Sequence, residues 1–162
     1  MENTIWSNIF SGKSRTQSRE ALALKHVPVF ENLNNYELEQ VKRLVHHRSY
    51  QPDEYVFRRN APGEGMYIIL KGNIEILDQN ENSLAILEEG DFFGDLSLLD
   101  KEPRSAHAIA RDHSELLGFF RPDLETLIKR KPDLAVKIIL NLAGVIGERL
   151  RKTNELLAEA SS

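Results

Sequence analysis

Between residues 54 and 121 the chain repeats short apolar segments, each separated from the next by residues typical of turns. Their apolar positions recur with a period of two or form brief continuous runs, which indicates β-strands, and Gly, Asn, Asp and Pro between them favour chain reversals. Strands this short and this closely spaced predict an antiparallel β-roll of the double-stranded β-helix or jelly-roll kind. The predicted strands are EYVFRR, GMYIILKG, NIEILDQ, SLAILEE, RSAHAIAR and ELLGFFR.

Helical patterns flank the predicted roll on both sides. Before it, Asn34 or Asn35 caps a predicted helix that extends to about His46. After Arg121, a short helix and a longer one each begin with Pro, whose missing N–H is harmless at the first helical position. The predicted fold class is therefore mainly β with flanking helices, with N-terminal helices and a long C-terminal helix.

The long C-terminal helix carries more apolar residues than one buried face requires. One stripe suits packing on the roll, and a second follows the alternating spacing of a helix–helix seam. We therefore expect a homodimer through this helix, while a helix buried within its own domain, or kinked at Gly144 and Gly147, would explain the same pattern. The seam-like stripe comprises Val136, Ile139, Ala143, Ile146, Leu150 and Leu157, and the neighbouring face carries Ile138, Leu142 and Val145.

The length of 162 residues fits one domain with extensions. We expect an N-terminal helical or flexible extension over residues 1–20, the roll with its N-terminal helices and a short helix over 21–131, and the long helix over 132–162. In the extension, the spacing of Ile5, Trp6, Ile9 and Phe10 predicts a short amphipathic helix. This helix either packs on the domain or docks on a membrane surface or a partner.

Composition excludes several classes of protein. The net charge of −4 argues against broad attraction to a nucleic-acid backbone, and no apolar run reaches the roughly 20 residues of a membrane helix. With no cysteine, the chain has no disulfide framework and no thiolate metal site. Because its start lacks the apolar region and the cleavage site of a secretory signal, we expect a cytoplasmic protein without a transmembrane segment.

The stretch FFGDLSLLDKEPRSAHA, residues 92–108, suggests an anion site. Gly94 permits a tight turn, and residues 95–99 fit one helical turn whose free N–H groups are able to hold an anion. Arg104 would add a fork of charged donors to the same anion. An internal salt bridge from Arg104 to Asp95 or Asp100 explains the same residues about as well.

The stretch resembles the phosphate-binding cassette of the cyclic-nucleotide-binding domain family, which includes catabolite activators and protein kinase A regulatory subunits. That cassette reads Phe-Gly-Glu-Leu-Ala-Leu, about five variable residues, then Pro-Arg and small residues; here it reads FGDLSLLDKEPRSA without an insertion. LKHVPVFENLNNYELEQV, GMYIILKGNIEIL and EEGDFFG are also similar to family segments, so the resemblance covers about residues 22–153. It implies the family fold and a cyclic nucleotide, cAMP or cGMP, as ligand.

Site residues follow from this resemblance position by position. It implies phosphate contacts from Arg104, Ser105, Ala106 and Ser97, and ribose contacts from Gly94, Asp95 and Leu96. The hydroxyl of Ser105 leaves cGMP open as a ligand. In dimeric activators of the family the long helix of the partner subunit reaches the purine after an Arg-Leu pair, here Arg149-Leu150. Possible purine contacts are Thr153 and Asn154, and also His107, which lies three residues beyond Arg104.

The chain departs from the family pattern in two places. The glutamate of the cassette is Asp95 here, shorter by one methylene, which weakens the implied contact with the ribose hydroxyl. Asp53 and Asn60 stand where relatives usually place turn glycines. Since Asp and Asn tolerate left-handed backbone geometry, we expect the fold to survive this second change.

The sequence favours a sensor over an enzyme. Its five histidines lack metal-ligand spacing, and no nucleophilic triad, glycine-rich nucleotide loop or carboxylate pair stands out, so we expect neither catalysis nor a metal. No helix-turn-helix follows the long helix, so we expect a stand-alone domain without direct DNA binding, acting on an unknown protein effector. The alternative is a degenerate fold that serves as a scaffold or interaction module without nucleotide binding.

Overall fold

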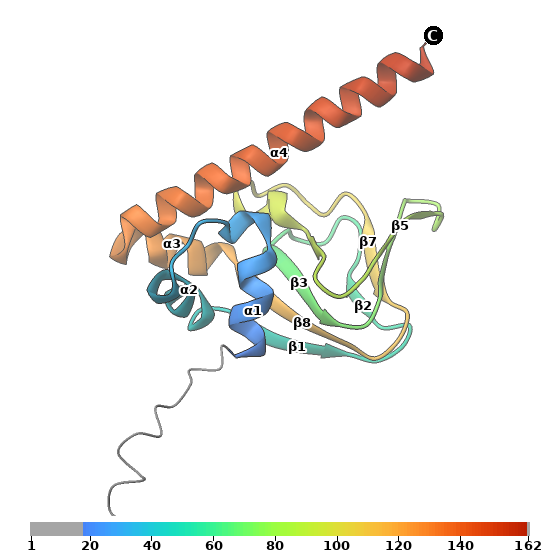
Figure 1. The fold of residues 1–162 in the computed structure, drawn as a ribbon. Coiled ribbons are helices and arrows are strands. Elements are labelled where there is room, and N and C mark those ends of the chain that lie inside the picture. The colour runs from blue at the N-terminus through green and yellow to red at the C-terminus, as the bar shows by residue number, and fades with distance from the viewer. Residues whose placement is uncertain (1–17, 162) are drawn as a thin grey trace, which may run out of the picture.

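The computed structural model describes residues 18–161. Two four-stranded antiparallel sheets form a β-roll, with helices α1 to α3 gathered at one end and α4 lying across the molecule (Figure 1). The predicted fold class, an antiparallel β-roll flanked by helices, is confirmed. No helix in the described part of the chain is long and apolar enough to cross a membrane.

Each sheet joins strands that lie far apart in the sequence. One has the order β1-β8-β3-β6 and the other the order β2-β7-β4-β5. In the first sheet β3 and β8 pair over most of their length, with Gly65 opposite Phe120. The strands are β1 His46–Tyr50, β2 Tyr55–Phe57, β3 Gly65–Lys71, β4 Ile74–Leu77, β5 Ser83–Leu87, β6 Phe92–Phe93, β7 His107–Ala110 and β8 Ser114–Phe120.

The core has two parts, one inside the roll and one between the roll and the helices. Alternate side chains of β3 divide between them: Tyr67 and Ile69 point into the roll, whereas Met66 and Ile68 pack against the helices. This division follows from the period of two along a strand. Because β3 is covered on both faces, it reads in the sequence as a continuous apolar run.

The helices are α1 Arg19–His26, a 3₁₀ turn η1 Pro28–Phe30, α2 Asn35–Lys42, the 3₁₀ turn η2 Asp95–Leu98, α3 Arg121–Arg130 and α4 Pro132–Ala160. Asn34 caps α2 in a reciprocal capping box with Glu37, as the sequence predicts for this start. The predicted end at about His46 is wrong. The helix stops at Lys42 because the following segment forms β1, which pairs with β8 over five residues.

Two strands lack a sequence signal. Strand β1 reads HHRSY and is almost entirely exposed, so it has no apolar alternation, and β6 has only two residues. Both are held by pairing with longer strands of the first sheet. The expected tolerance of left-handed turns is confirmed, since φ is 65° at Asp53 and 67° at Asn60.

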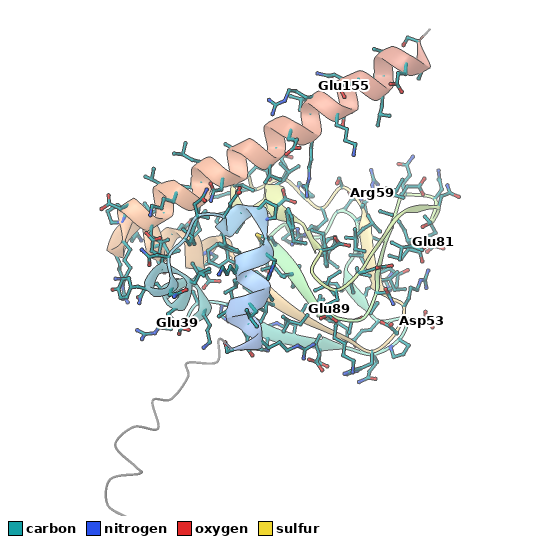
Figure 2. All side chains as sticks on the ribbon, in the orientation of Figure 1. Glu39, Asp53, Arg59, Glu81, Glu89 and Glu155 are labelled. Atoms are coloured by element: carbon teal, nitrogen blue, oxygen red, sulfur yellow. The ribbon has the colours of Figure 1, made fainter. Side chains whose placement is uncertain are left out.

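Helix α4 begins at Pro132 as predicted and continues without a break past both glycines. Its N-terminal half packs on η1 and α3, and its fully buried residues Ile138 and Leu142 join the core between these helices and the roll. The C-terminal half extends away from the roll, and Glu155 marks this part in Figure 2. Leu150 and Leu157 on it are 59% and 61% exposed, so the helix is not buried wholly within this chain. The amphipathic helix predicted around Ile5 to Phe10 lies outside the described residues.

Candidate functional site

A pocket of about 290 Å³ lies between the phosphate-cassette stretch, the roll and α4. Strands β2, β4 and β6 contribute apolar wall residues, and the loop from Gly94 to Ala106 contributes most of the polar ones. All the residues predicted to contact phosphate or ribose line this pocket. The lining comprises Phe57, Ile76, Phe93, Gly94, Asp95, Leu96, Ser97, Asp100, Glu102, Pro103, Arg104, Ser105, Ala106 and Arg149.

Gly94 joins β6 to η2 and lines the pocket. Its φ of 77° lies in the left-handed region, where a residue with a Cβ atom is strained. A Cβ atom at this position would also stand 2.6 Å from Nη1 of Arg104. Glycine is therefore needed here both for the turn and for the space that the guanidinium occupies.

The Arg104 side chain is buried and fixed in place. Its Nη1 donates to the carbonyl of Gly94 at 3.2 Å and to Oγ of Ser97 at 3.0 Å, and its Nη2 donates to the carbonyl of Gly65 at 2.7 Å. The guanidinium lies 4.1 Å from the ring centre of Phe57, within the range of a cation–π contact. These contacts orient a cation within the pocket lining.

Among the described residues Arg104 has no carboxylate partner in ion-pair range. The internal salt bridge to Asp95 or Asp100 is therefore not formed. Burial lowers the pKa of the Arg104 guanidinium from its ordinary value, and its Nε is buried without a hydrogen-bond partner in the described part of the chain. Glu64 acts on Arg104 only from beyond ion-pair distance. A buried cation without a carboxylate in ion-pair range is costly, so this site has the electrostatics that an anion would complete.

Asp95 is paired with α4 instead. Nη1 of Arg149 donates to its two carboxylate oxygens at 2.7 and 2.8 Å, and the Asp95 side chain is almost fully buried. Arg149 is half exposed and lies 5.1 Å from the ring centre of Phe92. The carboxylate implied for the ribose is thus already bound by an arginine of the long helix.

The three possible purine residues lie outside the pocket lining. Nδ1 of His107 accepts a hydrogen bond from the backbone N–H of Arg59 at 3.1 Å, and its ring packs edge-on against Tyr55. The placement of His107 as a ligand contact is therefore not supported by its geometry. Thr153 and Asn154 are exposed on α4, and the Thr153 hydroxyl donates to the carbonyl of Arg149.

Several residues of the lining are not among the predicted contacts. The strand pattern leaves Ile76 open as pocket wall or plain core, and Phe57 and Phe93 belong to strand patterns that suit a plain core equally well. The others are Asp100, Glu102, Pro103 and Arg149. Arg149 belongs to the Arg-Leu pair of the long helix, which was the available signal. Its partner Asp95 lies 54 residues earlier, and only the packing of α4 on the roll brings the two together.

Residues 47–131 match the family model of the cyclic nucleotide-binding domain. The chain belongs to this family. The Cyclic AMP receptor protein of Thermus thermophilus is 33% identical over 135 residues, which cover 81% of this chain and 61% of that protein. A cAMP-dependent protein kinase regulatory subunit of Schizosaccharomyces pombe is 25% identical over 126 residues, covering 78% of this chain and 31% of the relative.

The crystal structure of the Thermus thermophilus Catabolite Activator Protein superposes with a TM-score of 0.73 at 31% identity. The match covers 83% of this chain and 63% of that structure. This cyclic nucleotide-binding domain therefore spans less than two thirds of each of these relatives, and it is similar in sequence to a receptor and to a kinase regulatory subunit.

Proposed function

We propose that this cyclic nucleotide-binding domain is a sensor of cAMP or cGMP, with the cyclic phosphate bound at Arg104. The observation that carries the proposal is the buried guanidinium of Arg104, which lines the pocket and has no carboxylate partner among residues 18–161. A phosphate would supply the missing negative charge and acceptor oxygens. Ser97, Ser105 and Ala106 also line the pocket and are the other proposed phosphate contacts.

The ribose contact involves a competition. Asp95 is the residue proposed to accept the ribose hydroxyl, yet Arg149 already donates to both of its carboxylate oxygens. A bound ribose must either share this carboxylate with Arg149 or displace it. In both cases the ligand acts on α4, and it shifts the helix by its differential affinity for the two arrangements.

Helix α4 is the proposed dimer contact and output element. Its exposed apolar residues include Val136, Leu150 and Leu157, and a Cβ atom built at Gly144 meets nothing within 4 Å. Such a surface would allow a second α4 to approach closely. In such a dimer Thr153 and Asn154 of one copy are proposed to face the purine in the other.

The remaining parts of the proposal follow from this role. The domain would act in the cytoplasm as a regulator without catalysis of its own, and would pass its signal to a protein effector. The names of the two relatives, a receptor and a kinase regulatory subunit, support a regulatory role. One observation favours the alternative of a scaffold that has lost its ligand: the short Asp95 side chain is already engaged by Arg149.

Isothermal titration calorimetry with cAMP and with cGMP tests the proposal. We expect saturable binding of at least one nucleotide to the unaltered chain and loss of that binding in Arg104→Ala. Arg130→Ala is the control, because Arg130 is an exposed arginine at the end of α3, outside the pocket lining. Absence of heat with both nucleotides would favour the scaffold, and binding that survives Arg104→Ala would refute the phosphate site.

A further inference from the structure

Arg121 makes an unusual set of contacts at the start of α3. Its Nη2 lies within hydrogen-bond distance of the backbone carbonyls of Gly63 at 2.9 Å, Ser97 at 2.7 Å and Asp100, so its two N–H groups are shared among three acceptors. Its own backbone N–H donates to the carbonyl of Glu64 at 2.8 Å. One side chain thus joins the turn before β3, the turn η2 and the loop after η2 to the first residue of α3.

The position of Arg121 is unfavourable for a cation when α3 is considered alone. The N-terminus of a helix carries a partial positive charge, so a positive side chain in the first turn is destabilising. Its Nε is buried without a partner among residues 18–161, and the described structure gives the side chain no carboxylate partner. The three carbonyl dipoles offset these costs, which indicates that Arg121 serves the pocket loop rather than the helix.

The contacts of Ser97 connect Arg121 with the proposed phosphate ligand. The Ser97 hydroxyl accepts from Arg104 at 3.0 Å, while its carbonyl accepts from Arg121 at 2.7 Å. Gly63 packs tightly beside them, since a Cβ atom there would stand 2.8 Å from the carbonyl oxygen of Glu102. The two arginines therefore bind the side chain and the backbone of one residue in a close-packed junction.

We propose that Arg121 is a positioning residue that fastens the loop of residues 94–104 to α3. Because α3 packs on α4, a rearrangement of this loop reaches the long helix through Arg121. The anchoring of the loop stands on the contacts above, and its role in transmitting a ligand signal rests on the proposed nucleotide binding. Arg121 itself is not part of the pocket lining.

Hydrogen exchange of the ligand-free chain tests the anchoring. Four amides report on closure of the loop: those of Ser97, Leu99, Asp100 and Arg104 each donate to a backbone carbonyl. In Arg121→Met, which keeps the side-chain length but removes the donors, we expect these amides to exchange about tenfold faster. Exchange in β3 should not change, which also establishes that the variant is folded.

Two further variants sharpen this test. Arg19→Met is the control, because Arg19 donates to the carbonyl of Leu70 at 2.6 Å away from the pocket, and it should leave the four loop amides unchanged. Arg121→Lys keeps the positive charge but not the planar guanidinium, so the exchange rates of the loop amides should rise by an intermediate amount. It replaces Arg121→Met if that variant does not fold. Unchanged exchange of the loop amides in the folded Arg121 variants would overturn the proposal.

Hydrogen exchange at a saturating concentration of cAMP tests whether Arg121 transmits the ligand signal to α4. If only cGMP binds, that nucleotide is used instead. In the unaltered chain we expect the nucleotide to alter exchange in α4 residues 143–155, and in Arg121→Met to bind without this change. An equal response of α4 in both proteins would overturn the transmission role. Failure of the unaltered chain to bind either nucleotide would refute the proposed function instead, while the ligand-free result would still decide the anchoring.

Discussion

Arg149 on α4 donates from one guanidinium nitrogen to both carboxylate oxygens of Asp95, at 2.7 and 2.8 Å. This pair is the only ion pair between α4 and the pocket loop in the described part of the chain. It joins Asp95, the residue proposed to bind the ribose, to α4, the helix proposed to pass on the signal. The occupancy of the pocket and the position of the helix therefore depend on the same carboxylate.

Breaking this pair should destabilise the chain. Arg149→Met leaves the buried Asp95 carboxylate without its partner, and because Arg149 is half exposed we expect a loss of about 1–2 kcal/mol in the free energy of unfolding. Urea denaturation measures it. Arg151→Met, on the exposed part of the same helix, should cost less. Equal losses in the two variants would show that the pair contributes nothing.

Lengthening the acidic side chain should strengthen nucleotide binding. Asp95→Glu restores the length found in the family cassette, so its carboxylate should reach the ribose hydroxyl more easily. We expect about tenfold tighter binding of the preferred nucleotide, the contribution of one added hydrogen bond to a charged group. Calorimetry measures the affinity, with Asp100→Glu as a control on the same pocket lining. Unchanged or weaker affinity in Asp95→Glu would contradict this assignment.

Gly94 and Gly90 allow backbone strain to be separated from steric conflict. Both have positive φ, 77° and 90°, but only at Gly94 would a Cβ atom meet the Arg104 guanidinium. Both alanine variants should lose about 1 kcal/mol of unfolding free energy from backbone strain. Only Gly94→Ala should lose more than this and also lose nucleotide affinity. Similar behaviour of the two variants in urea denaturation and calorimetry would exclude the steric account.

The exposed face of α4 should determine the oligomeric state. Leu150→Glu places a charge on the proposed seam, so we expect a dimer to become a monomer in sedimentation velocity experiments. Leu84→Glu is the matched control, because Leu84 on β5 is similarly exposed, 62% against 59%, and lies outside the seam. A monomeric unaltered chain, or a dimer that persists in Leu150→Glu, would rule out this interface.

Asp112 should make stability depend on pH. The backbone N–H of Asn73 and then its side-chain amide donate to the carboxylate, and these hydrogen bonds lower the pKa of Asp112 from its ordinary value. Because the pKa is lower in the folded state, these hydrogen bonds add to the free energy of unfolding above the unfolded-state pKa of about 3.9. Their contribution is lost as the pH falls through the folded-state pKa.

Asp112→Asn should therefore cost more unfolding free energy at about pH 7 than at about pH 2.5, which lies below the unfolded-state pKa, so that part of the stability due to the carboxylate has been lost there. Urea denaturation of the two proteins at both pH values measures this difference. A cost that is the same at both values would exclude the carboxylate hydrogen bonds as its source.

The architecture could be predicted from the sequence because the residues that mark its turns and helix starts lie within or beside the elements they define. Gly, Asn and Pro mark the turns around β3, β4 and β5, and Pro132 marks the start of α4. Strand β1 was not accessible, since its exposed residues HHRSY lack alternation and only pairing with β8 defines the strand. The local sequence pattern did not predict a strand where pairing with a neighbouring strand, rather than the segment's own residues, determines its conformation.

The site residues also differ in whether a local sequence pattern predicts them. The spacing from Gly94 to Arg104 lies within one loop, and the structure brings both residues into one pocket. The contact between Asp95 and Arg149 joins elements 54 residues apart, so no local pattern predicts it. His107 also shows the limit of spacing arguments: it lies close to Arg104 in sequence, yet its ring accepts a hydrogen bond from Arg59 outside the pocket.

The stacking of Arg104 on Phe57 has a consequence for the kinetics of binding. Water is removed from this guanidinium when the chain folds, and three acceptors and an aromatic ring already hold its orientation. An arriving anion would meet a preorganised cation and would have little side-chain motion to freeze. Association should therefore approach the rate set by diffusion and docking, and differences in affinity among ligands should arise mainly in their dissociation rates.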